Sequence, residues 1–352
     1  MKINEILSKI PFDSQNEYQN LDLDDIFYDS RNYKKNSLYV CLNGFTFDGH
    51  SYAQAMYDKG TRFFAAEHAL FLPSDATVFI CKNTRKFLAL ASANLFNNPS
   101  KKLFTVAITG TKGKTSTSFM LKNILEQTSK KVGIIGTTGI IFNDTHIESD
   151  NSTPESYLLH KYMRDMLDSG IDTLVMEASS QGFKMDRTYG INFDIGIFTN
   201  LSPDHIGESE HKDFDEYLNC KKMLFSQCIT GFFNCDDENF INISSNCTCK
   251  MITFGKNKNA NVKYSNDAYF SENGKLFSSF DISFQAETYH FKIPLLGEIS
   301  VYNSACAAAA ACYLGISFKD IERGLCKTRI IGRNEIVPIP LDFTVIIDYA
   351  HN

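Results

Sequence analysis

Several features of membrane, zinc-binding and nucleic-acid-binding proteins are missing from this sequence of 352 residues. It has no run of about 18 apolar residues, so we expect no membrane span. Its first residues lack the apolar core that a signal peptide needs. The net charge is −6, whereas nucleic acids and anionic membranes attract basic surfaces. These absences favour a soluble, cytoplasmic protein that neither binds nucleic acid nor inserts into a membrane.

The 10 cysteines and 8 histidines show no zinc-site spacing. No two cysteines have the Cys-x-x-Cys pattern; Cys247 and Cys249 are separated by one residue, and the others are scattered. We interpret the cysteines as free thiols, buried or at the surface, in a reducing compartment. A chain of this length can bury large cores, so neither a disulfide nor a metal is needed for stability.

The chain length predicts two or three domains. Residues 97–100, Asn-Asn-Pro-Ser, favour a linker because these residue types favour turns. We therefore expect a small α/β domain over 1–98 and a central domain over 99–331. The last expected strand, 343–347, has no helix after it, so residues 332–352 resemble the start of a domain that the chain does not complete.

The pattern after the linker is that of an α/β domain. Residues 103–108 form a short apolar run that is typical of a buried parallel strand. Expected strands then alternate with expected helices, which predicts a mostly parallel sheet wrapped by helices. The strands are expected at 103–108, 132–136, 173–176 and 195–199, and the helices at 114–127, 155–169, 214–227 and 301–314. Residues 232–291 instead predict short antiparallel strands.

The strongest local signal is the glycine-rich segment 109–116, Thr-Gly-Thr-Lys-Gly-Lys-Thr-Ser. It lies between an expected buried strand and an expected helix, which is the setting of a phosphate-binding loop. Glycines let backbone N–H groups approach phosphate oxygens, and the helix N-terminus adds positive potential. Ile108 stands where the full pattern has its first glycine, so a chance Gly-Lys-Thr turn is the alternative. The loop alone leaves motors, kinases, GTPases and ligases open.

Two further positions follow expected parallel strands, where ligands bind in such sheets. Glu177 ends one strand and offers the hard oxygen that Mg²⁺ prefers; the alternative is a solvated carboxylate. His205 follows the next strand, and taken alone it is a hydrogen-bonded loop histidine. On composition alone, Lys221 and Lys222 are surface lysines that extend their ammonium groups into water.

Taken together, these segments resemble one family, the Mur ligases. Residues 108–117 resemble that family's phosphate loop, and 176–180, Met-Glu-Ala-Ser-Ser, resemble its M-E-[VA]-S-S motif. Further matches follow in the family's order: 198–205 resembles F-T-N-L-x-x-D-H, 217–225 Y-x-x-x-K-x-x-L-F, 332–335 G-R-x-E, and 348–351 D-Y-A-H. Segments 29–31 and 44–50, with Thr153 and Pro154, resemble the branch of UDP-N-acetylmuramoyl-tripeptide synthetases.

The resemblance implies an ATP-dependent ligase of peptidoglycan precursor synthesis. Such an enzyme joins UDP-N-acetylmuramoyl-L-Ala-D-Glu to a diamino acid through an acyl phosphate and releases ADP and phosphate. Its implied architecture is a UDP-binding domain, a phosphate-loop central domain and a Rossmann-like C-terminal domain, which this chain lacks for the most part. The choice between L-lysine and meso-diaminopimelate stays open, because that last domain carries the amino-acid site.

Site residues follow from the resemblance, position by position. Catalytic roles fall to Lys114, Glu177, His205 and Lys221. The implied ATP contacts are Gly110, Thr111, Lys112, Gly113, Lys114, Thr115, Ser116, Asn303, Arg333 and Asp348. The implied Mg²⁺ ligands are Thr115, Glu177, His205 and Lys221, the last as a CO₂-derived carbamate. The implied contacts to the UDP-substrate are Ser30, Arg31, Gly49, His50, Thr153, Pro154 and Ser179.

Departures from the family keep two other readings open. Gln181 and Gly182 stand where many relatives have His-Ala, and Asn352 stands where threonine is frequent. Because the last domain is largely absent, we expect binding of nucleotide and UDP-substrate with little ligation, so a non-catalytic binding fragment is one alternative. A folylpolyglutamate synthetase is another, and segments 29–31 and 49–50 count against it. A phosphate-loop switch or motor would need a second acidic motif that we do not find.

Overall fold

The computed structural model describes residues 1–44, 47–207, 210–272, 275–330, 332, 335–337, 343 and 345–348. The chain forms two compact units. The first comprises Met1–Lys102, Pro154–Asp168 and Gln181–Ile191, and the second Leu103–Thr153, Ser169–Ser180 and Asn192–Asn352. Two segments from the middle of the chain therefore pack with the N-terminal residues. None of the helices in the described ranges has the length and apolar character needed to traverse a bilayer.

The first unit is built on a five-stranded sheet with strand order β1-β5-β4-β3-β2. Strands β2 to β5 are parallel, and β1 runs antiparallel along β5. The strands are β1 (Asp13–Ser14), β2 (Asp25–Phe27), β3 (Ser37–Val40), β4 (Phe63–Ala66) and β5 (Thr77–Ile80). The helical elements are α1 (Ile3–Ile6), η1 (Ser30–Asn32), η2 (Gly49–Tyr52), α2 (Ala53–Asp58), α3 (Thr84–Leu95), η3 (Pro99–Lys101) and α5 (Ser156–Asp168).

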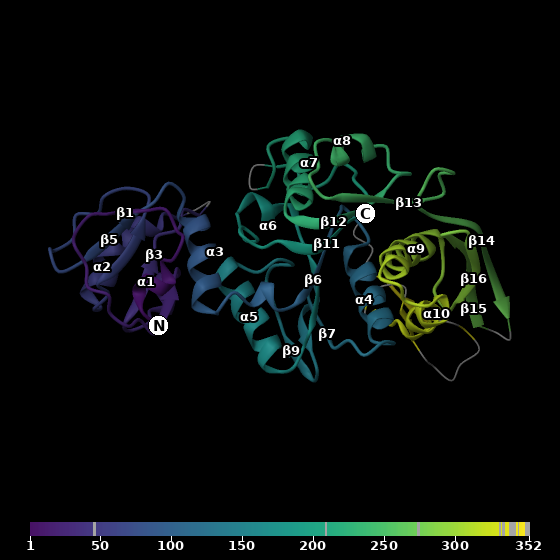
Figure 1. The fold of residues 1–352 in the computed structure, drawn as a ribbon, viewed down its shortest axis with the longest axis horizontal. Coiled ribbons are helices and arrows are strands. Elements are labelled where there is room, and N and C mark those ends of the chain that lie inside the picture. Colours follow the sequence, from purple (N-terminus) through teal and green to yellow (C-terminus); the bar gives the residue numbers. More distant parts are fainter. Residues whose placement is uncertain are drawn as a thin grey trace. The chain divides into compact units, whose positions relative to one another are not determined.

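Both faces of this small sheet are covered (Figure 1). Apolar residues of α1 and α3 pack on one face, where Tyr157 of α5 joins them. Ala53 and Met56 of α2 pack on the other face. All four residues of β3 are buried for this reason, as expected for a parallel strand with helices on both sides.

The second unit contains an eleven-stranded sheet in the order β16-β15-β14-β13-β12-β11-β6-β10-β7-β8-β9. Its centre, from β7 to β13, is parallel. The parallel strands are β6 (Phe104–Thr109), β7 (Val132–Gly136), β10 (Thr173–Glu177), β11 (Phe193–Phe198), β12 (Cys228–Asn234) and β13 (Lys250–Gly255). The outer strands are β8 (Gly139–Phe142), β9 (Thr145–Ile147), β14 (Val262–Glu272), β15 (Lys275–Phe284) and β16 (Glu287–Ile293).

Three helices share a large apolar core with this sheet. They are α4 (Lys114–Leu125), α9 (Glu298–Tyr313) and α10 (Phe318–Lys327), and in Figure 1 α9 and α10 lie between α4 and β14–β16. Every residue of α9 from Asn303 to Cys312 is buried, which explains its alanine-rich sequence. A Cβ atom on Gly324 would lie 2.5 Å from Cα of Ile124, so α10 approaches α4 too closely for any larger residue there.

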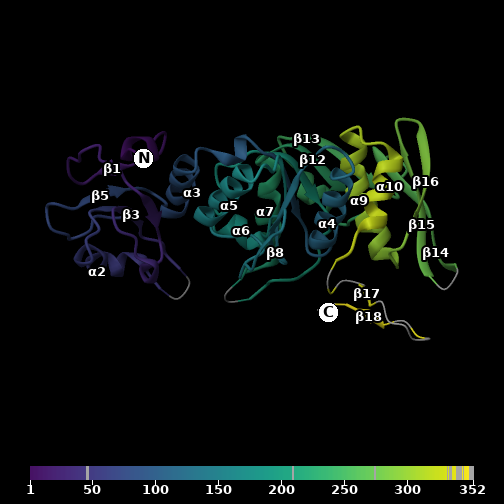
Figure 2. The ribbon, with the colours of Figure 1, turned by 90° about the horizontal axis from the view of Figure 1, so that it is seen from below.

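The remaining elements flank the sheet or follow it. They are α6 (Ser180–Lys184), α7 (Phe214–Lys222), η4 (Met223–Ser226), α8 (Phe240–Ser244), β17 (Glu335–Val337) and β18 (Val345–Ile347). Strands β17 and β18 form a separate two-stranded ribbon, seen in Figure 2.

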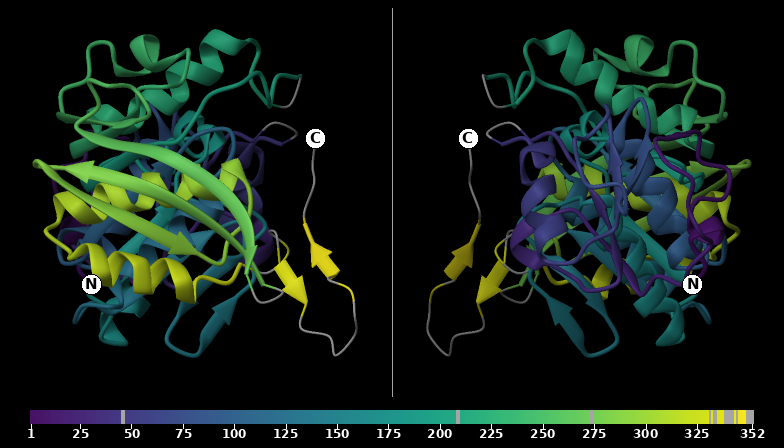
Figure 3. Two further views of the ribbon diagram at one scale, coloured as in Figure 1. Left: turned by 90° about the vertical axis from the view of Figure 1, so that its right-hand side faces the viewer. Right: turned by 90° about the vertical axis from the view of Figure 1, so that its left-hand side faces the viewer.

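The mostly parallel α/β fold expected from the sequence is confirmed, but the antiparallel part is smaller than expected. The antiparallel pattern expected over 232–291 begins only beyond β14, because β12 and β13 continue the parallel sheet. Figure 3 shows the long antiparallel strands of residues 262–293 in green. The helix expected over 214–227 ends at Lys222 and gives way to the 3₁₀ turn η4.

Candidate active site

A glycine-rich loop connects the central strand β6 to the N-terminus of α4. Gly110 and Gly113 adopt positive φ angles of 152° and 85°, which glycine tolerates best. A Cβ atom on Gly110 would lie 1.9 Å from Oγ1 of Thr199, and one on Gly113 would lie 2.3 Å from Oδ1 of Asn303. Both glycines are therefore required by conformation and by space, which makes a chance Gly-Lys-Thr turn a poor account of the segment.

The loop is held by residues that follow β11, the neighbouring strand. The backbone N–H of Lys112 donates to Oδ1 of Asn200 at 2.8 Å, and Nδ2 of Asn200 donates back to the Lys112 carbonyl at 3.0 Å. The Thr199 hydroxyl donates to the same carbonyl at 2.7 Å. The loop is thus held in its cradle shape before any ligand arrives, which lowers the ordering cost of binding.

Glu177 is buried at the carboxyl end of β10, with 1% of its surface exposed. Its Oε1 accepts hydrogen bonds from the Thr115 hydroxyl at 2.9 Å and from the Thr137 N–H at 3.0 Å. Its Oε2 accepts from the Thr137 hydroxyl at 3.0 Å. A Cβ atom on Gly136 would lie 2.4 Å from Oε1, so the space for this carboxylate depends on a glycine.

Thr137 is the residue of this cluster that sequence reasoning missed. The signal was present, because Thr137 follows the strand 132–136, whose carboxyl end lies on the same sheet edge as those of β6 and β10. Threonine is common in loops, however, and nothing in its immediate sequence distinguishes Thr137 from Thr138.

Lys221 is buried beside the phosphate loop, with 1% of its surface exposed. Its Nζ donates to the Gly110 carbonyl oxygen at 2.8 Å and lies 4.4 Å from the ring centre of Tyr217. Burial, and secondarily the nearby Lys114 ammonium, holds the pKa of Lys221 well below its ordinary value. The composition-based view of Lys221 as a surface lysine is therefore wrong, and the side chain favours the neutral amine.

Lys114 begins α4 and curls back over the loop. Its Nζ donates to the carbonyl oxygens of Gly110 at 2.8 Å and of Thr111 at 3.1 Å. The Thr111 hydroxyl in turn contacts the Tyr217 hydroxyl at 3.0 Å. The structure thus brings Lys114, Lys221 and the loop carbonyls together at one point.

His205 is placed differently from Glu177. Its side chain is 47% exposed, and its Nδ1 lies 2.8 Å from Oε1 of Glu210. Its Nε2 lies 4.0 Å from Oδ2 of Asp204. Among the described residues, no group of three or more histidine, cysteine or acidic side chains is arranged to hold a metal ion. The ring centre of His205 lies 6.0 Å from that of Tyr217, whose ring and hydroxyl also contact Lys221 and Thr111.

Asn303 of α9 lies beside Gly113, the residue that precedes α4. Asn303 is 2% exposed, and its Oδ1 has no hydrogen-bond partner among the described residues. A buried oxygen without a partner costs about 1–3 kcal/mol. This atom is therefore available to a donor group on a ligand.

The expected substrate-binding residues of the second unit, Thr153 and Ser179, contact each other. The Thr153 hydroxyl donates to the Glu177 carbonyl at 3.0 Å, and the Ser179 N–H donates to Oγ1 of Thr153 at 2.9 Å. These bonds tie both residues to the end of β10. Pro154, by contrast, belongs to the first unit.

The other expected substrate-binding residues lie in the first unit, in two short 3₁₀ turns. Ser30 and Arg31 belong to η1, where the Arg31 guanidinium pairs with Asp29 at 2.7 Å. Gly49 and His50 belong to η2, and a Cβ atom on Gly49 would lie 2.7 Å from the Leu42 backbone nitrogen. The His50 ring lies 2.6 Å from the Asp48 carboxylate and accepts a backbone N–H from Glu67 at 3.0 Å. Both ring nitrogens of His50 thus already serve the fold.

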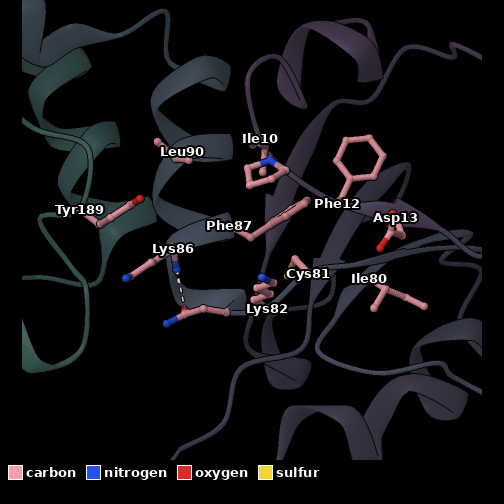
Figure 4. Close-up of a pocket in the computed structure, with 12 residues that line it drawn as sticks. Ile10, Phe12, Asp13, Ile80, Cys81, Lys82, Lys86, Phe87, Leu90 and Tyr189 are labelled. Carbon is pink, nitrogen blue, oxygen red and sulfur yellow. Dashed lines mark hydrogen bonds between the residues drawn. The ribbon is translucent and has the colours of Figure 1, made fainter.

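A cavity of about 430 Å³ opens elsewhere in the first unit (Figure 4). Part of its wall is apolar and consists of Ile10, Phe12 and Phe87. Lys86 and Tyr189 also line the cavity, and Nζ of Lys86 lies 4.9 Å from the ring centre of Tyr189. None of the expected substrate-binding residues lines this cavity.

Of the expected ATP contacts near the end of the chain, Asp348 follows β18, whereas Arg333 lies outside the described residues.

A glycine cradle between a central parallel strand and a helix, with a buried carboxylate on the adjacent strand, defines a phosphate-loop nucleotide-binding protein. A family model described as the Mur ligase middle domain matches residues 108–311. The whole chain is 38% identical to the UDP-N-acetylmuramoyl-L-alanyl-D-glutamate–2,6-diaminopimelate ligase of Clostridium tetani and covers 72% of that protein. The chain belongs to the Mur ligase family, whose members are ATP-dependent ligases that form C–N bonds.

Solved structures give the same fold. A UDP-N-acetylmuramoyl-L-alanyl-D-glutamate–2,6-diaminopimelate ligase matches with a TM-score of 0.83 at 22% identity, over 96% of this chain and 69% of that chain. A folylpolyglutamate synthase of Mycobacterium tuberculosis matches with a TM-score of 0.62 at 17% identity, over 76% of this chain and 67% of that chain. At these identities the likeness concerns the fold alone.

Mur ligases use ATP and Mg²⁺, and part of this site suits that ion. Mg²⁺ prefers hard oxygen ligands, and the Thr115 hydroxyl and Glu177 carboxylate place two such oxygens 2.9 Å apart at the start of α4. The pair therefore fits the metal. His205 offers a ring nitrogen and no oxygen, and its Nδ1 pairs with Glu210.

Proposed function

We propose that this chain belongs to an enzyme that adds a diamino acid to UDP-N-acetylmuramoyl-L-Ala-D-Glu in peptidoglycan precursor synthesis, in the cytoplasm. The main support is the 38% identity over the whole chain to a UDP-N-acetylmuramoyl-L-alanyl-D-glutamate–2,6-diaminopimelate ligase. Because the named relatives are 2,6-diaminopimelate ligases, we favour diaminopimelate over lysine as the amino acid. We keep the division into a UDP-substrate domain over 1–98, an ATP domain over 99–331 and the start of a third domain at 332–352.

The proposed reaction uses the phosphate loop for positioning and charge neutralisation. The γ-carboxylate or α-carboxylate oxygen of the substrate's D-Glu attacks the γ-phosphorus of ATP, which gives an acyl phosphate and ADP. The amine of the diamino acid then attacks the acyl carbon, forms a tetrahedral intermediate and expels phosphate. Lys114 neutralises charge on the β- and γ-phosphates, while Thr115 and Glu177 hold Mg²⁺, which supplies further charge neutralisation when bound.

Lys221 is proposed to act as a carbamate. A neutral amine adds to CO₂ and loses one proton, which converts a nitrogen base into an anionic oxygen ligand. The lowered pKa of Lys221 supports this step, because only the unprotonated amine reacts. Protein labelled with ¹³CO₂ should give a carbamate NMR signal that a Lys221→Met variant lacks; equal signals from both proteins would refute the assignment.

The remaining positions keep the roles that the family resemblance suggests. Ser30, Arg31, Gly49 and His50 are proposed to contact the uridine nucleotide, the last through its backbone, because its ring is engaged with Asp48. We propose that Thr153, Pro154 and Ser179 contact the muramoyl peptide, and that Gly110 to Ser116, Asn303, Arg333 and Asp348 contact ATP. His205 is proposed to serve as a metal ligand through Nε2, since its Nδ1 is paired with Glu210 and a carboxylate on the other ring nitrogen is the usual arrangement for a ligating histidine.

The decisive experiment measures phosphate release from ATP and Mg²⁺, with and without UDP-N-acetylmuramoyl-L-Ala-D-Glu. We expect release that depends on this substrate and is lost in Lys114→Ala. Folate with glutamate in place of the UDP-substrate tests the folylpolyglutamate alternative, and stimulation by folate alone would overturn the proposal. Binding of the UDP-substrate with no phosphate release would mean that residues 1–352 act as a binding module and that ligation needs more than they contain.

A further inference from the structure

Three cysteines lie where β12 and β13 begin. Cys228 is the first residue of β12, and Cys249 immediately precedes β13. The side chains of Cys228 and Cys247 both lie close enough to Cys249 to shift the pKa of its thiol. All ten cysteines lie in the described part of the chain and are free thiols.

The sheet provides the space for two of the sulfur atoms. Gly196 of β11 and Gly231 of β12 are register partners in neighbouring strands. A Cβ atom on Gly196 would lie 2.9 Å from Sγ of Cys228, and one on Gly231 would lie 2.7 Å from Sγ of Cys249. Neighbouring strands are about 4.8 Å apart, so two adjacent glycines leave one recess in which the two sulfurs lie side by side.

The strand register also selects the pair that can form a disulfide. Thr230 of β12 pairs with Lys250 of β13, so Cys228 and Cys249 lie at the starts of adjacent parallel strands. Disulfides need Cα atoms about 4.4–6.8 Å apart, which is the spacing of close neighbours on adjacent strands. Cys247 and Cys249 are separated by one residue in the same chain segment, so a disulfide between them would close a very short and strained ring.

The three thiols differ in acidity and access. Hydrogen bonds from Cys228 first, and also from Cys247, lower the pKa of Cys249 to about 7, although partial burial opposes this shift. The interaction with Cys249 raises the pKa of Cys228, and burial first, then the negative charge of Cys249, raises the pKa of Cys247. Cys247 and Cys249 are partly exposed, whereas Cys228 is buried. Cys249 thus has the thiolate character and access of a reactive cysteine.

We propose that Cys249 is a peroxide-reactive thiol and that Cys228 converts the oxidised Cys249 into a Cys228–Cys249 disulfide. The Cys249 thiolate attacks one oxygen of a hydroperoxide and breaks the O–O bond, which yields a sulfenic acid and, after protonation, an alcohol or water. The Cys228 thiol then attacks the Cys249 sulfur, forms the S–S bond and releases water. Two thiols are oxidised by two electrons, and the hydroperoxide is reduced by the same two.

This site does not depend on the proposed ligase reaction, and it goes beyond the sequence-based interpretation of the cysteines as free thiols, buried or at the surface. The arrangement also does not favour a metal, because no described cluster of three such ligands is arranged to hold one. Cys235 offers an internal comparison, since it is partly exposed but burial raises its pKa.

The test treats the reduced protein with one equivalent of hydrogen peroxide and maps its disulfides by mass spectrometry without reduction. We expect a Cys228–Cys249 linked peptide that dithiothreitol removes, with Cys235 unmodified. Cys228→Ser should instead accumulate a sulfenic acid at Cys249 that dimedone traps, and Cys247→Ser should still form the disulfide. A Cys247–Cys249 link, or oxidation of Cys235 to the same extent as Cys249, would overturn the proposal.

A second measurement needs no variant and therefore does not depend on variant folding. The rate of iodoacetamide labelling at each cysteine of the native protein is followed from pH 5 to pH 9. The labelling rate of Cys249 should rise about tenfold for each pH unit until it levels off near pH 7. The rate for an ordinary thiol levels off at about pH 8.5. A midpoint for Cys249 equal to that of Cys235 would refute a reactive Cys249.

Discussion

Lys114 and Lys221 donate hydrogen bonds to the same backbone oxygen, the carbonyl of Gly110, each at 2.8 Å. The two amines reach it from α4 and from α7, which are far apart in the sequence. Two ammonium groups at one oxygen repel each other, and Lys221 is the buried one. The phosphate loop therefore contacts one lysine near its surface and one lysine whose burial lowers its pKa, which fits the proposed roles of Lys114 in phosphate binding and of Lys221 as a carbamate.

Replacing Lys221 by methionine should stabilise the protein at pH 7 and abolish ligation. In the folded wild type burial lowers the pKa of the Lys221 amine well below its ordinary value, whereas in the unfolded chain the amine keeps the ordinary pKa of about 10.4. The unfolded state thus binds more protons, so wild-type stability rises with pH until that value is reached. Lys221→Met removes this dependence, and its advantage should shrink as the pH rises from 7 to 10.

Urea unfolding of wild type and variant in buffer purged of CO₂ checks this prediction, with Lys222→Met as the matched neighbour. Lys222 is half-buried and bonded to Ser245, so its replacement should change the free energy of unfolding by less than about 0.5 kcal/mol and leave ligation intact. A difference between Lys221→Met and wild type that does not vary with pH would contradict a neutral Lys221.

Replacing Gly110 by alanine should lower the free energy of unfolding much more than the same replacement at another glycine with a positive φ. The new Cβ would meet Oγ1 of Thr199 at 1.9 Å, and its displacement would break the bond from Thr199 to the Lys112 carbonyl. Gly315→Ala is the matched control, because Gly315 has a φ of +75° and open space around it. We expect the free energy of unfolding to fall by about 1–2 kcal/mol in the control, and by more in Gly110→Ala, as urea unfolding can measure.

Nucleotide affinity separates the two glycine variants further. Titration calorimetry with Mg-ADP should show at least about tenfold weaker binding for Gly110→Ala, or about 1.4 kcal/mol, and unchanged binding for Gly315→Ala. Equal affinities in the two variants would mean that the loop geometry does not determine nucleotide binding.

The local parts of this site could be predicted from the sequence, whereas its long-range contacts could not. The strand, loop and helix around Lys114 are continuous in the chain, and Glu177 ends an apolar run, so neighbouring residues show their roles. Lys221 lies next to a second lysine in a polar helix, and its buried amine donates a hydrogen bond to a carbonyl 111 residues away. Thr137 is equally inconspicuous, since its partner is a carboxylate 40 residues away. Such contacts depend on strand order, which the pattern of one segment does not encode.

Replacing Glu177 by glutamine should weaken Mg²⁺ binding and also lower stability. Glutamine keeps one acceptor oxygen but turns an NH₂ group toward the Thr115 or Thr137 donors, which costs about 1–3 kcal/mol. Loss of the charged oxygen should raise the Mg²⁺ concentration needed for half-maximal phosphate release about 10–100-fold. Glu126→Gln is the control, because Glu126 pairs with Lys122 on the outer side of α4. An unchanged Mg²⁺ requirement in Glu177→Gln would remove Glu177 from the metal site.

Replacing Asn303 by alanine should separate nucleotide binding from stability. Among the described residues Oδ1 of Asn303 is buried without a hydrogen-bond partner. Its removal should lower the free energy of unfolding by less than about 1 kcal/mol, because relief of the unpaired oxygen offsets the lost packing. The same atom lies at the start of α4, 2.3 Å from where a Cβ of Gly113 would be, and we propose that it accepts a hydrogen bond from the adenine amino group. Losing that bond should weaken the affinity for ADP about tenfold, so that the affinities for ADP and GDP become more alike.

Calorimetric titration with ADP and with GDP checks the Asn303 prediction, and urea unfolding gives the stability of the same samples. Ser304→Ala is the matched control on α9, because Ser304 is equally buried but its hydroxyl contacts Met120 instead of the loop. The control should keep the wild-type preference for ADP over GDP. If Asn303→Ala keeps that preference too, the amide does not contact the base, and its unpartnered oxygen must serve another part of the nucleotide or none.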